Sequence, residues 1–402
     1  MLVDIEAEMT AQERAIRDAA HKFALDVMRP AAKQLDTLAD PADVIAPKSI
    51  LWDVFKKHRA AGLDDMESAT AELTPLQRAR VGALYSEEMG WGDSGLAISL
   101  GVSGFHKTFV MMSGRPSLVD RYLNSSSAGG EIGCWAVTEP DHGSDQLGFT
   151  EPHFTDPSVR ANCIATRDGD DYVIRGQKSA WVSNGTIATV AALFCQIDPS
   201  EGLRSGGVAV VPLDLPGVSR GKPTDKLGQR PLNQGEIFFD EVRIPAEYMT
   251  VGKDNYQTIV QMILTGANAA MGQMFVGLGR ASLEHAIGYA AERVQGGRPI
   301  NQHQSVKGRL FKMFMQVEAA RALARRVAYY NATNTPLLQY SIASKVFCTQ
   351  TAFDVSSDAV QIFGGVGLTK EFPVEKLMRD ARASMIEDGC NEILGLVGAA
   401  LL

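Results

Sequence analysis

Two adjacent carboxylates near the end of the chain, Glu387 and Asp388, are the residues best suited to proton-transfer chemistry. Apolar Met385 and Ile386 precede them, and Gly389 follows. A carboxylate among apolar neighbours loses hydration, which raises its pKa and strengthens it as a base. The same residues also fit a solvated helix terminus with acids in the first turn, which the helix dipole favours. The local sequence leaves both interpretations open.

The composition is typical of a folded protein. Apolar residues make up 45% and charged residues 21% of the 402 residues, which predicts two or three folded domains. A net charge of -8 without a basic cluster argues against nucleic-acid binding. Met1 to Met9 are acidic without an apolar core, so we expect no signal peptide, and no apolar run predicts membrane insertion. The five cysteines are scattered without metal-type spacing, so we expect reduced thiols in a cytoplasmic protein.

The elements that must position these carboxylates begin with an N-terminal helical domain over residues 1–130. Thr10-Ala11-Gln12-Glu13 is typical of a capping box, and we expect its helix to end at Pro30. Apolar periodicity predicts further helices over 50–61, from Thr74-Pro75 to Gly90, and over 96–112.

Residues 131–248 change to short apolar runs between turn residues, which predicts a middle β-barrel or sandwich. No Gly-x-Gly-x-x-Gly follows a strand, so a Rossmann half is not expected. Two stretches combine hydroxyls with turns, Thr138 to Asp145 and Trp181 to Gly185. Their backbone donors and hydroxyls suit a flat heteroaromatic ring or a carbonyl, although ordinary turns contain the same residues.

Residues 249–402 return to helical spacing and predict a four-helix bundle, with helices near 255–295, 303–332, 336–362 and 374–402. Its Ala, Gly and Met residues allow close helix approach, which also suits a subunit interface. Arg293 lies in the link before Gly296 and Gly297, where a guanidinium suits a pyrophosphate. A surface arginine is the alternative interpretation.

Four motifs in this order resemble the flavin-dependent acyl-CoA dehydrogenases. Thr138 to Asp145 is similar to the family's Thr-Glu-Pro-x-x-Gly-Ser-Asp motif, and Trp181 to Gly185 is similar to its Trp-(Ile/Val)-(Thr/Ser)-Asn-Gly motif. Lys226 to Arg230 and Phe238 to Pro245 resemble the next two signatures. The resemblance spans nearly the whole chain and implies a mainly helical fold with a central β domain. It is weakest over residues 30–130.

The resemblance implies FAD as cofactor and an acyl-CoA as substrate. The residues that it implies for FAD are Thr138, Ser144, Trp181, Ser183, Arg293, His303, Gln304, Gln361, Gly364, Gly365, Cys390 and Glu392. Of these, Arg293 and Gln304 match family residues that bind FAD across a subunit boundary, which implies a homotetramer. The residues that it implies for the substrate side are Ser144, Thr265, Asn268 and Gly389.

The family removes an α-proton with a glutamate base while hydride passes to the flavin. Alignment on Gly389 places Asp388 at the base position, with Glu387 as the alternative base. The second base position used by some relatives is Ala267 here. Thr265 and Asn268 replace an aspartate and an arginine of the family, and Cys390 and Glu392 replace its threonine and glutamine.

The resemblance implies α,β-dehydrogenation of an acyl-CoA, with electrons passing to an electron-transfer flavoprotein. Two alternatives remain open from the sequence. An aspartate base is also used by nitroalkane-oxidising relatives, which predicts a flavin oxidase of a small acidic carbon substrate. A non-catalytic subunit of a hetero-oligomer would keep the fold without turnover.

Overall fold

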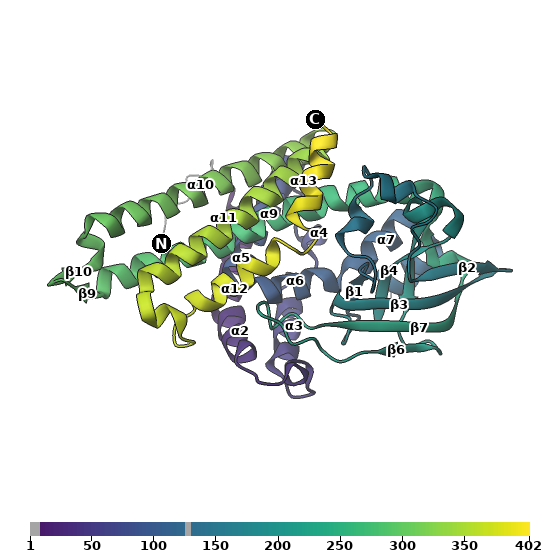
Figure 1. The fold of residues 1–402 in the computed structure, drawn as a ribbon, viewed down its shortest axis with the longest axis horizontal. Helices are drawn as coiled ribbons and strands as arrows, with labels where there is room; N and C mark the ends of the chain where they lie inside the picture. The colour runs from purple at the N-terminus through teal and green to yellow at the C-terminus, as the bar shows by residue number, and fades with distance from the viewer. Residues whose placement is uncertain (1–8, 125–129) are drawn as a thin grey trace.

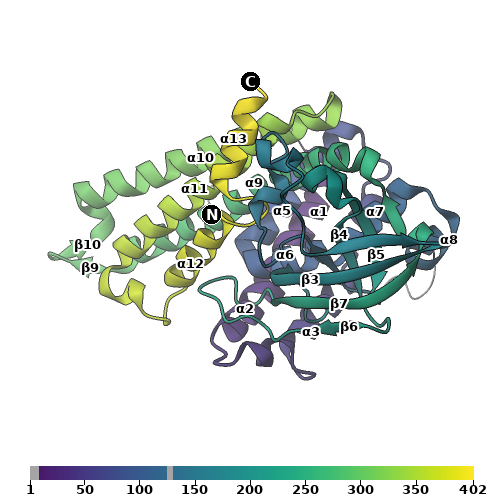
Figure 2. The same cartoon turned by 45° about the vertical axis from the view of Figure 1, so that its right-hand side comes forward.

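The computed structural model describes residues 9–124 and 130–402, and it has a helical half and a sheet half (Figure 1). Turning the molecule by 45° shows the long helices on one side and the strands on the other (Figure 2). The prediction that Met1 to Met9 contain no signal peptide falls outside the described residues, except for Met9.

Helices fill the described part of the N-terminal segment: α1 Ala11–Phe23, η1 Ala24–Met28, α2 Arg29–Asp36, η2 Pro41–Ile45, α3 Ile50–Ala60, α4 Met66–Ala69, α5 Pro75–Gly92, α6 Ser94–Ser103, α7 Phe105–Ser113, α8 Pro116–Val119 and η3 Asp120–Asn124. The capping box at Thr10 is confirmed, and Thr74 forms a second one with Gln77. The segment predicted over 96–112 is two helices, because the chain turns at Gly104 between α6 and α7.

The prediction that the first helix ends at Pro30 is wrong. The helical path continues through η1, a π-helical stretch, and through α2 to Asp36. Pro30 is the second residue of α2, where a proline ring fits because the first turn of a helix needs no N–H donor there. The wider π turn ahead of Pro30 restarts the hydrogen-bond pattern.

The predicted middle β domain is confirmed, and its strands are β1 Gly133–Ala136, β2 Ile164–Asp168, β3 Asp171–Ser183, β4 Val190–Gln196, β5 Gly206–Pro212, β6 Val218–Arg220, β7 Gln234–Pro245 and β8 Met249–Val251. They form one sheet in the order β6-β7-β3-β1-β4-β5-β8, and β2 pairs with both β3 and β4. Short turns connect them: η4 Ser144–Leu147, η5 Pro152–Thr155, η6 Pro199–Ser205 and η7 Ala246–Tyr248.

The C-terminal part contains α9 Lys253–Glu292, β9 Val294–Gln295, β10 Arg298–Pro299, η8 Ile300–Gln302, α10 Gln304–Thr333, α11 Leu338–Phe363, η9 Gly364–Leu368, α12 Val374–Ser384 and α13 Asn391–Ala400. Three of the four predicted bundle helices are confirmed. The fourth is two helices, because Asp388 and Gly389 adopt φ of 54° and 90° between α12 and α13. The acids therefore follow a helix end, and the prediction of acids in a first helical turn is wrong.

Helix α9 is long and apolar enough to cross a membrane by length and composition, with a mean hydropathy of 1.3. Half of that apolar stretch is buried inside the protein, because α9 packs against α5, α10 and α11. Its apolar character therefore has an explanation in the core of the helical half.

One hydrophobic core joins the sheet to the helices that flank the acid pair. Phe194 and Val210 of the sheet pack with Leu264 of α9, Ile342 of α11 and Leu394 of α13. This core fixes the start of α13 against the sheet and therefore positions the turn before it. The domain boundaries at 130/131 and 248/249 stay predictions.

Candidate active site

The turn from Met385 to Cys390 is held at both ends. The Asn391 N–H donates to the Met385 carbonyl at 3.0 Å, which closes the turn. The Cys390 N–H donates to Oγ of Ser144 at 2.9 Å, which ties the turn to the Thr138 to Asp145 motif. A side chain on Gly389 would lie 3.0 Å from Leu394, and its φ of 90° favours glycine. The fold therefore brings Ser144, Gly389 and Cys390 together.

The two carboxylates differ in their surroundings, although both are half-buried. Burial raises the pKa of Asp388 to about 6, and the positive charge of Lys345 works against that rise. Within residues 9–124 and 130–402, the Asp388 carboxylate accepts no hydrogen bond. Burial raises the pKa of Glu387 to about 7, and the neighbouring Asp388 charge contributes to the rise. Both groups are therefore prepared to take up a proton near neutral pH.

Glu387 is engaged by side chains from a different part of the fold. Its Oε1 accepts a hydrogen bond from Nε2 of Gln229 at 2.7 Å. Gln229 has φ of 49°, and its N–H donates to Asp380 of α12. Burial lowers the pKa of Lys226 to about 8. The negative charge of Glu387 is the largest influence that works against this lowering. The motif Lys226 to Arg230 therefore holds Glu387 through Gln229, a contact that no local sequence pattern indicates.

The motif residues of the sheet lie beside one another. The Ser179 N–H donates to the Thr138 carbonyl at 2.8 Å, and Ser183 pairs with Trp135 of β1. Nε2 of Gln234 donates to Oγ of Ser183 at 3.2 Å. Its Oε1 accepts a hydrogen bond from Lys226 at 2.8 Å, so one chain of contacts runs from the sheet motif to the loop that holds Glu387.

Trp181 presents its indole outward at the end of β3. Trp181 is 54% exposed, and it lies within a register shift between β3 and β7 that spans Lys178 to Val182. Such a bulge turns a side chain away from the regular alternation of the strand. Thr138 follows β1, and Trp181 and Ser183 lie at the end of β3, the strand that pairs with β1.

The Thr138 to Asp145 turn is built around buried polar contacts. Glu139 is buried with Lys178, whose Nζ lies 2.5 Å from Oε1 of Glu139. Nδ1 of His142 lies 2.7 Å from Asp145, and its Nε2 lies 2.9 Å from the Arg160 carbonyl. Although burial opposes it, these two contacts raise the pKa of His142. His142 thereby ties the motif to the long loop that follows it.

The remaining predicted FAD residues lie at the far tip of the helical half. Figure 1 shows the β9–β10 hairpin at one end of the molecule and the sheet at the other. The rings of Tyr289 and Phe363 stack there at 4.1 Å, which joins the ends of α9 and α11. Exposed residues at this tip are Arg293, Gln304, Gln361, Gly364 and Gly365. One chain therefore does not bring them to Trp181.

Three predicted residues make local contacts within the chain. Nε2 of His303 lies 2.9 Å from the Gln295 carbonyl and braces the β9–β10 hairpin. Thr265 donates to the Gln261 carbonyl at 2.7 Å and lines a groove of about 890 Å³ between α5, α9, α10 and α11. Asn268 is buried and donates to the Leu264 carbonyl at 2.9 Å. Glu392 is exposed in the first turn of α13.

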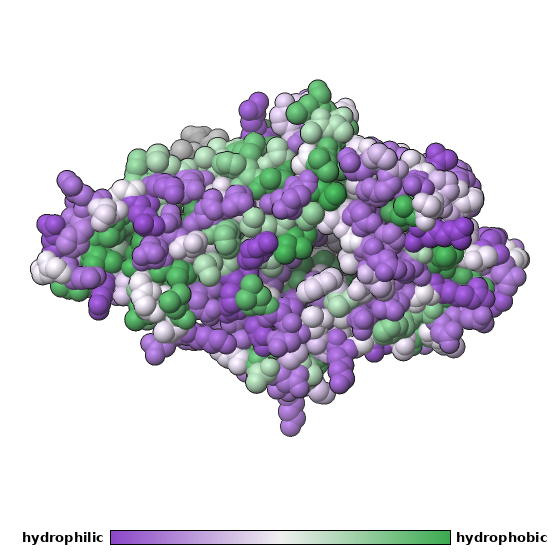
Figure 3. All heavy atoms as spheres, in the orientation of Figure 1, coloured by the Kyte–Doolittle hydropathy of each residue, from purple (hydrophilic) through white to green (hydrophobic). Residues whose placement is uncertain are grey.

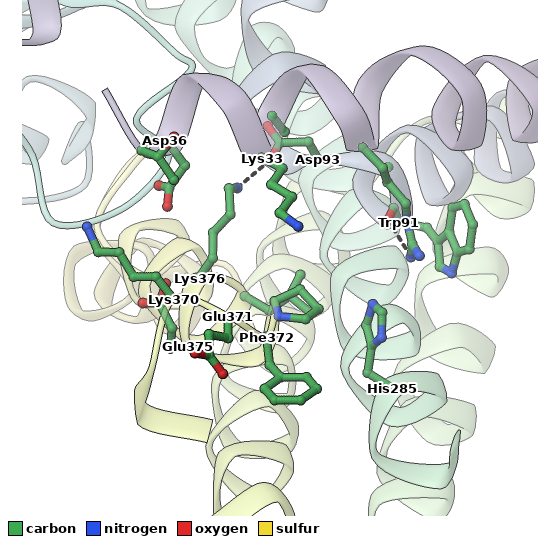
Figure 4. A pocket seen from close by; sticks show the side chains of 16 residues that line it. Lys33, Asp36, Trp91, Asp93, His285, Lys370, Glu371, Phe372, Glu375 and Lys376 are labelled. Atoms are coloured by element: carbon green, nitrogen blue, oxygen red, sulfur yellow. Dashed lines mark hydrogen bonds and ion pairs between the residues drawn. The ribbon is translucent and has the colours of Figure 1, made fainter. Parts of the chain in front are cut away.

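A cavity of about 260 Å³ lies between α2, α9 and α12 and contains none of the predicted site residues (Figure 4). Two of its acids are paired: Lys376 contacts Asp93, and Asp36 lies 2.7 Å from Arg379 just beside the cavity. The lining includes neither carboxylate of the acid turn, so we assign this cavity no chemistry.

Sequence reasoning missed the roles of Gln229 and Lys345, which contact the acid turn, and of Lys226, whose charge acts on Glu387. Lys345 is fully buried in α11, and its Nζ donates to the Gly389 carbonyl at 2.8 Å. The only signal in the sequence was a lysine on the apolar stripe between Ile342 and Val346.

Known proteins share this arrangement. Residues 134–242 match the family model described as acyl-CoA dehydrogenase, middle domain, and residues 258–402 match acyl-CoA dehydrogenase, C-terminal domain. The chain is 31% identical to a short-chain specific acyl-CoA dehydrogenase of Megasphaera elsdenii, over 79% of this chain and 81% of that protein.

Solved structures agree with that match. The butyryl-CoA dehydrogenase of Megasphaera elsdenii has a TM-score of 0.85 at 26% identity, over 98% of this chain and 99% of that chain. A structure described as an electron transferring flavoprotein of Acidaminococcus fermentans has a TM-score of 0.85 at 26% identity, over 99% of this chain and 100% of that chain.

Proposed function

This chain belongs to the acyl-CoA dehydrogenase family, and from that premise we propose that it dehydrogenates a short acyl-CoA thioester with Asp388 as the base. The observation that carries the proposal is the left-handed turn at Asp388, tied by Ser144 and Cys390 to the sheet motif. Enzymes of this family are FAD-dependent oxidoreductases that act on acyl-CoA substrates.

The residues of this chain fit FAD at two places. At the sheet edge, the exposed indole of Trp181 and the hydroxyl of Ser183 present a flat surface with a polar group for a ring system. At the far tip, Arg293 is exposed beside a turn with open backbone at Gly364 and Gly365, where added Cβ atoms would meet nothing within 4 Å. An arginine fork and free backbone suit pyrophosphate oxygens. Bound FAD supplies the hydride acceptor for the reaction.

Asp388 has the properties that α-proton removal requires. Its carboxylate is held in a turn, has a pKa of about 6, and has no hydrogen bond within the described residues. It is therefore mostly ionised at neutral pH and free to take a proton from carbon. The Asp388 N–H also lacks an acceptor in the described part of the chain, so it can donate to the thioester oxygen as enolate charge develops.

The two ends of the FAD site support an assembly of several chains. Because Arg293 lies beside the β9–β10 hairpin at the tip of the helical half and Trp181 lies on β3 of the sheet half, a single FAD at Trp181 would contact Arg293 from a second copy. Exposed apolar side chains along the helices include Phe311, Met315, Phe347 and Leu396, and Figure 3 shows apolar surface over the helical half. We propose a homotetramer on this basis.

An electron-transfer flavoprotein is the proposed electron acceptor. Support comes from the family and from the similar structure described as an electron transferring flavoprotein. The second candidate function is that of a flavin oxidase, because an aspartate at the base position also suits oxidation of a small acidic carbon compound. In that case oxygen would reoxidise the flavin rapidly, and no thioester would be needed.

Anaerobic flavin bleaching tests the proposal directly. The purified protein is expected to be yellow and to lose its flavin absorbance when butyryl-CoA or another short acyl-CoA is added without oxygen. The panel extends to branched and alicyclic acyl-CoAs and to nitroalkanes. Bleaching by a nitroalkane but by no thioester would overturn the proposal in favour of the oxidase, and a colourless protein that takes up no FAD would exclude both.

A further inference from the structure

A buried lysine lies directly behind the acid turn. Lys345 comes from the middle of α11, and its side chain has no exposed surface. Nζ donates to the Gly389 carbonyl at 2.8 Å and to Oδ1 of Asn391 at 2.9 Å. Burying an ammonium group is costly, so a lysine at such a position has a specific role that an apolar residue could not fill.

These two contacts hold the C-terminal end of the turn, one at its backbone and one at the side chain of the first residue of α13. Gly389 follows Asp388 directly, and Asn391 begins α13. Asn391 is itself held, because its Nδ2 donates to Oγ1 of Thr349 at 3.1 Å, one turn further along α11. The Gly389 carbonyl and the Cys390 N–H belong to the same peptide, so Lys345 and Ser144 hold this peptide from both sides and fix the backbone that directly follows Asp388.

The charge of Lys345 acts on the same group. The ionisable groups that face it are Asp388, Glu387, Cys390 and Glu392, all from the turn and the start of α13. Burial lowers the pKa of Lys345 to about 8, and Asp388 contributes most to keeping it protonated. Lys226 lies on the other side, nearest to Glu387, and is not among the charges that act on Asp388. Lys345 is therefore the one described cation that acts on Asp388.

We propose that Lys345 is a positioning residue for the base: it fixes the Gly389 carbonyl and places a positive charge behind the Asp388 carboxylate. Lys345 itself touches neither substrate nor cofactor in this proposal, which rests on the proposed function of Asp388. The hydrogen bonds orient the carboxylate, and the charge keeps it ionised at the pH where it must accept a proton.

The test is the pH dependence of flavin reduction in Lys345→Met and Lys345→Arg. The rate of flavin reduction falls at low pH as Asp388 becomes protonated, and this fall is the acid limb of the pH profile. Without the cation, Asp388 holds its proton to higher pH, so the acid limb in Lys345→Met should move up by about one pH unit. The limiting rate should fall about tenfold because the carboxylate is less well oriented. Lys345→Arg keeps the charge, so its acid limb should stay near that of the unchanged protein.

Cys348→Ala is the matched control. Cys348 is also buried in α11 but faces the Ala320 carbonyl of α10, so this change should leave the acid limb in place. If Lys345→Met folds poorly, Lys345→Gln keeps a hydrogen-bond donor and removes the charge, and the same shift is expected. An acid limb that does not move in either neutral variant would overturn the proposal.

A second measurement separates this proposal from the proposed function. The difference in Tm between Asp388→Asn and the unchanged protein follows the ionisation of Asp388, and its midpoint should lie at higher pH in a Lys345→Met background. This readout needs no substrate. If no acyl-CoA bleaches the flavin but the midpoint moves, the proposed function fails and the coupling between Lys345 and Asp388 stands.

Discussion

Gln229 donates from Nε2 to Oε1 of Glu387 at 2.7 Å, across 158 positions of sequence. This contact separates two acids that are neighbours in the chain. Glu387 is held by the loop that carries Lys226, whereas no side chain of the described residues donates to Asp388. A base must be free to accept the proton of the substrate. Asp388 can do so without breaking a hydrogen bond, whereas Glu387 would first have to release Gln229.

Replacing each acid by its amide should therefore have unequal effects. Asp388→Asn should keep FAD and lose anaerobic bleaching by about a thousandfold or more, because the base is absent. Glu387→Gln keeps the shape and a hydrogen-bond partner for Gln229, so bleaching should stay within about tenfold. Stopped-flow absorbance measures both rates. Normal bleaching in Asp388→Asn together with a silent Glu387→Gln would assign the base to Glu387.

Asp388 should also make stability depend on pH. Its pKa is 3.8 in the unfolded chain and about 6 in the fold, so the folded protein binds the proton more tightly. The free energy of unfolding therefore falls as the pH rises from about 4 to about 6, because the folded protein loses a proton that it binds more tightly than the unfolded chain does. Asp388→Asn cannot ionise, so it should be more stable than the unchanged protein above pH 6, by about 1–2 °C in Tm.

This difference should vanish near pH 4, where the unchanged protein carries the proton as well. Thermal unfolding at a series of pH values measures it, with exposed Glu392→Gln as the control. A gain in Tm that is the same at every pH would mean that the substitution changes packing and not ionisation.

The sequence predicted the parts of this fold that depend on neighbouring residues. The capping box at Thr10, the helix start at Thr74-Pro75, the strands and three long bundle helices follow from local sequence patterns. It did not predict that α12 ends before the acids, because the residues around Met385 continue a helical pattern. The break depends on positive φ at Asp388 and on partners that are distant in sequence, Ser144 and Lys345.

The site was predictable only where a motif carried it. Ser144 contacts the acid turn through Cys390, and Ser183 pairs with β1, so two motifs are joined to their surroundings by these contacts. The roles of Thr138, Ser144, Trp181 and Ser183 in binding FAD stay predictions. Gln229 belongs to a matched motif, but its contact with Glu387 depends on how two loops meet, and no local pattern encodes that meeting.

Arg293 should matter for FAD binding and not for the acid turn. It is exposed at the tip of the helical half, so Arg293→Ala should leave the fold intact while removing a pyrophosphate contact. We expect the Kd of FAD to rise about tenfold, measured by titrating apoprotein with FAD. Lys307→Ala removes a nearby exposed cation on α10 and serves as the control. Equal FAD affinity in both variants would contradict the assignment of Arg293.

Glu87 should be central to the stability of the helical half. It is buried in α5, where its carboxylate lies 2.9 Å from Arg280 of α9 and 2.9 Å from Arg321 of α10, and 3.2 Å from Arg325. Burial alone would raise the pKa of Glu87, but these three arginines hold it below its ordinary value. The carboxylate thus stays charged and joins three helices that hydrophobic packing alone would leave free to slide.

Glu87→Ala would leave buried arginines without their shared counter-charge, so unfolding should cost about 3–5 kcal/mol less. Urea unfolding followed by circular dichroism measures this loss, and Glu371→Ala, an exposed acid on the loop before α12, should change stability by less than about 0.5 kcal/mol.

Because the pKa of Glu87 is lowered in the fold, its contribution is present at neutral pH and is lost as the pH falls through that lowered value. The two variants should therefore differ at pH 7 and converge in strong acid. A Glu87→Ala protein as stable as Glu371→Ala at pH 7 would show that packing, and not this charge cluster, holds α5 against α9 and α10.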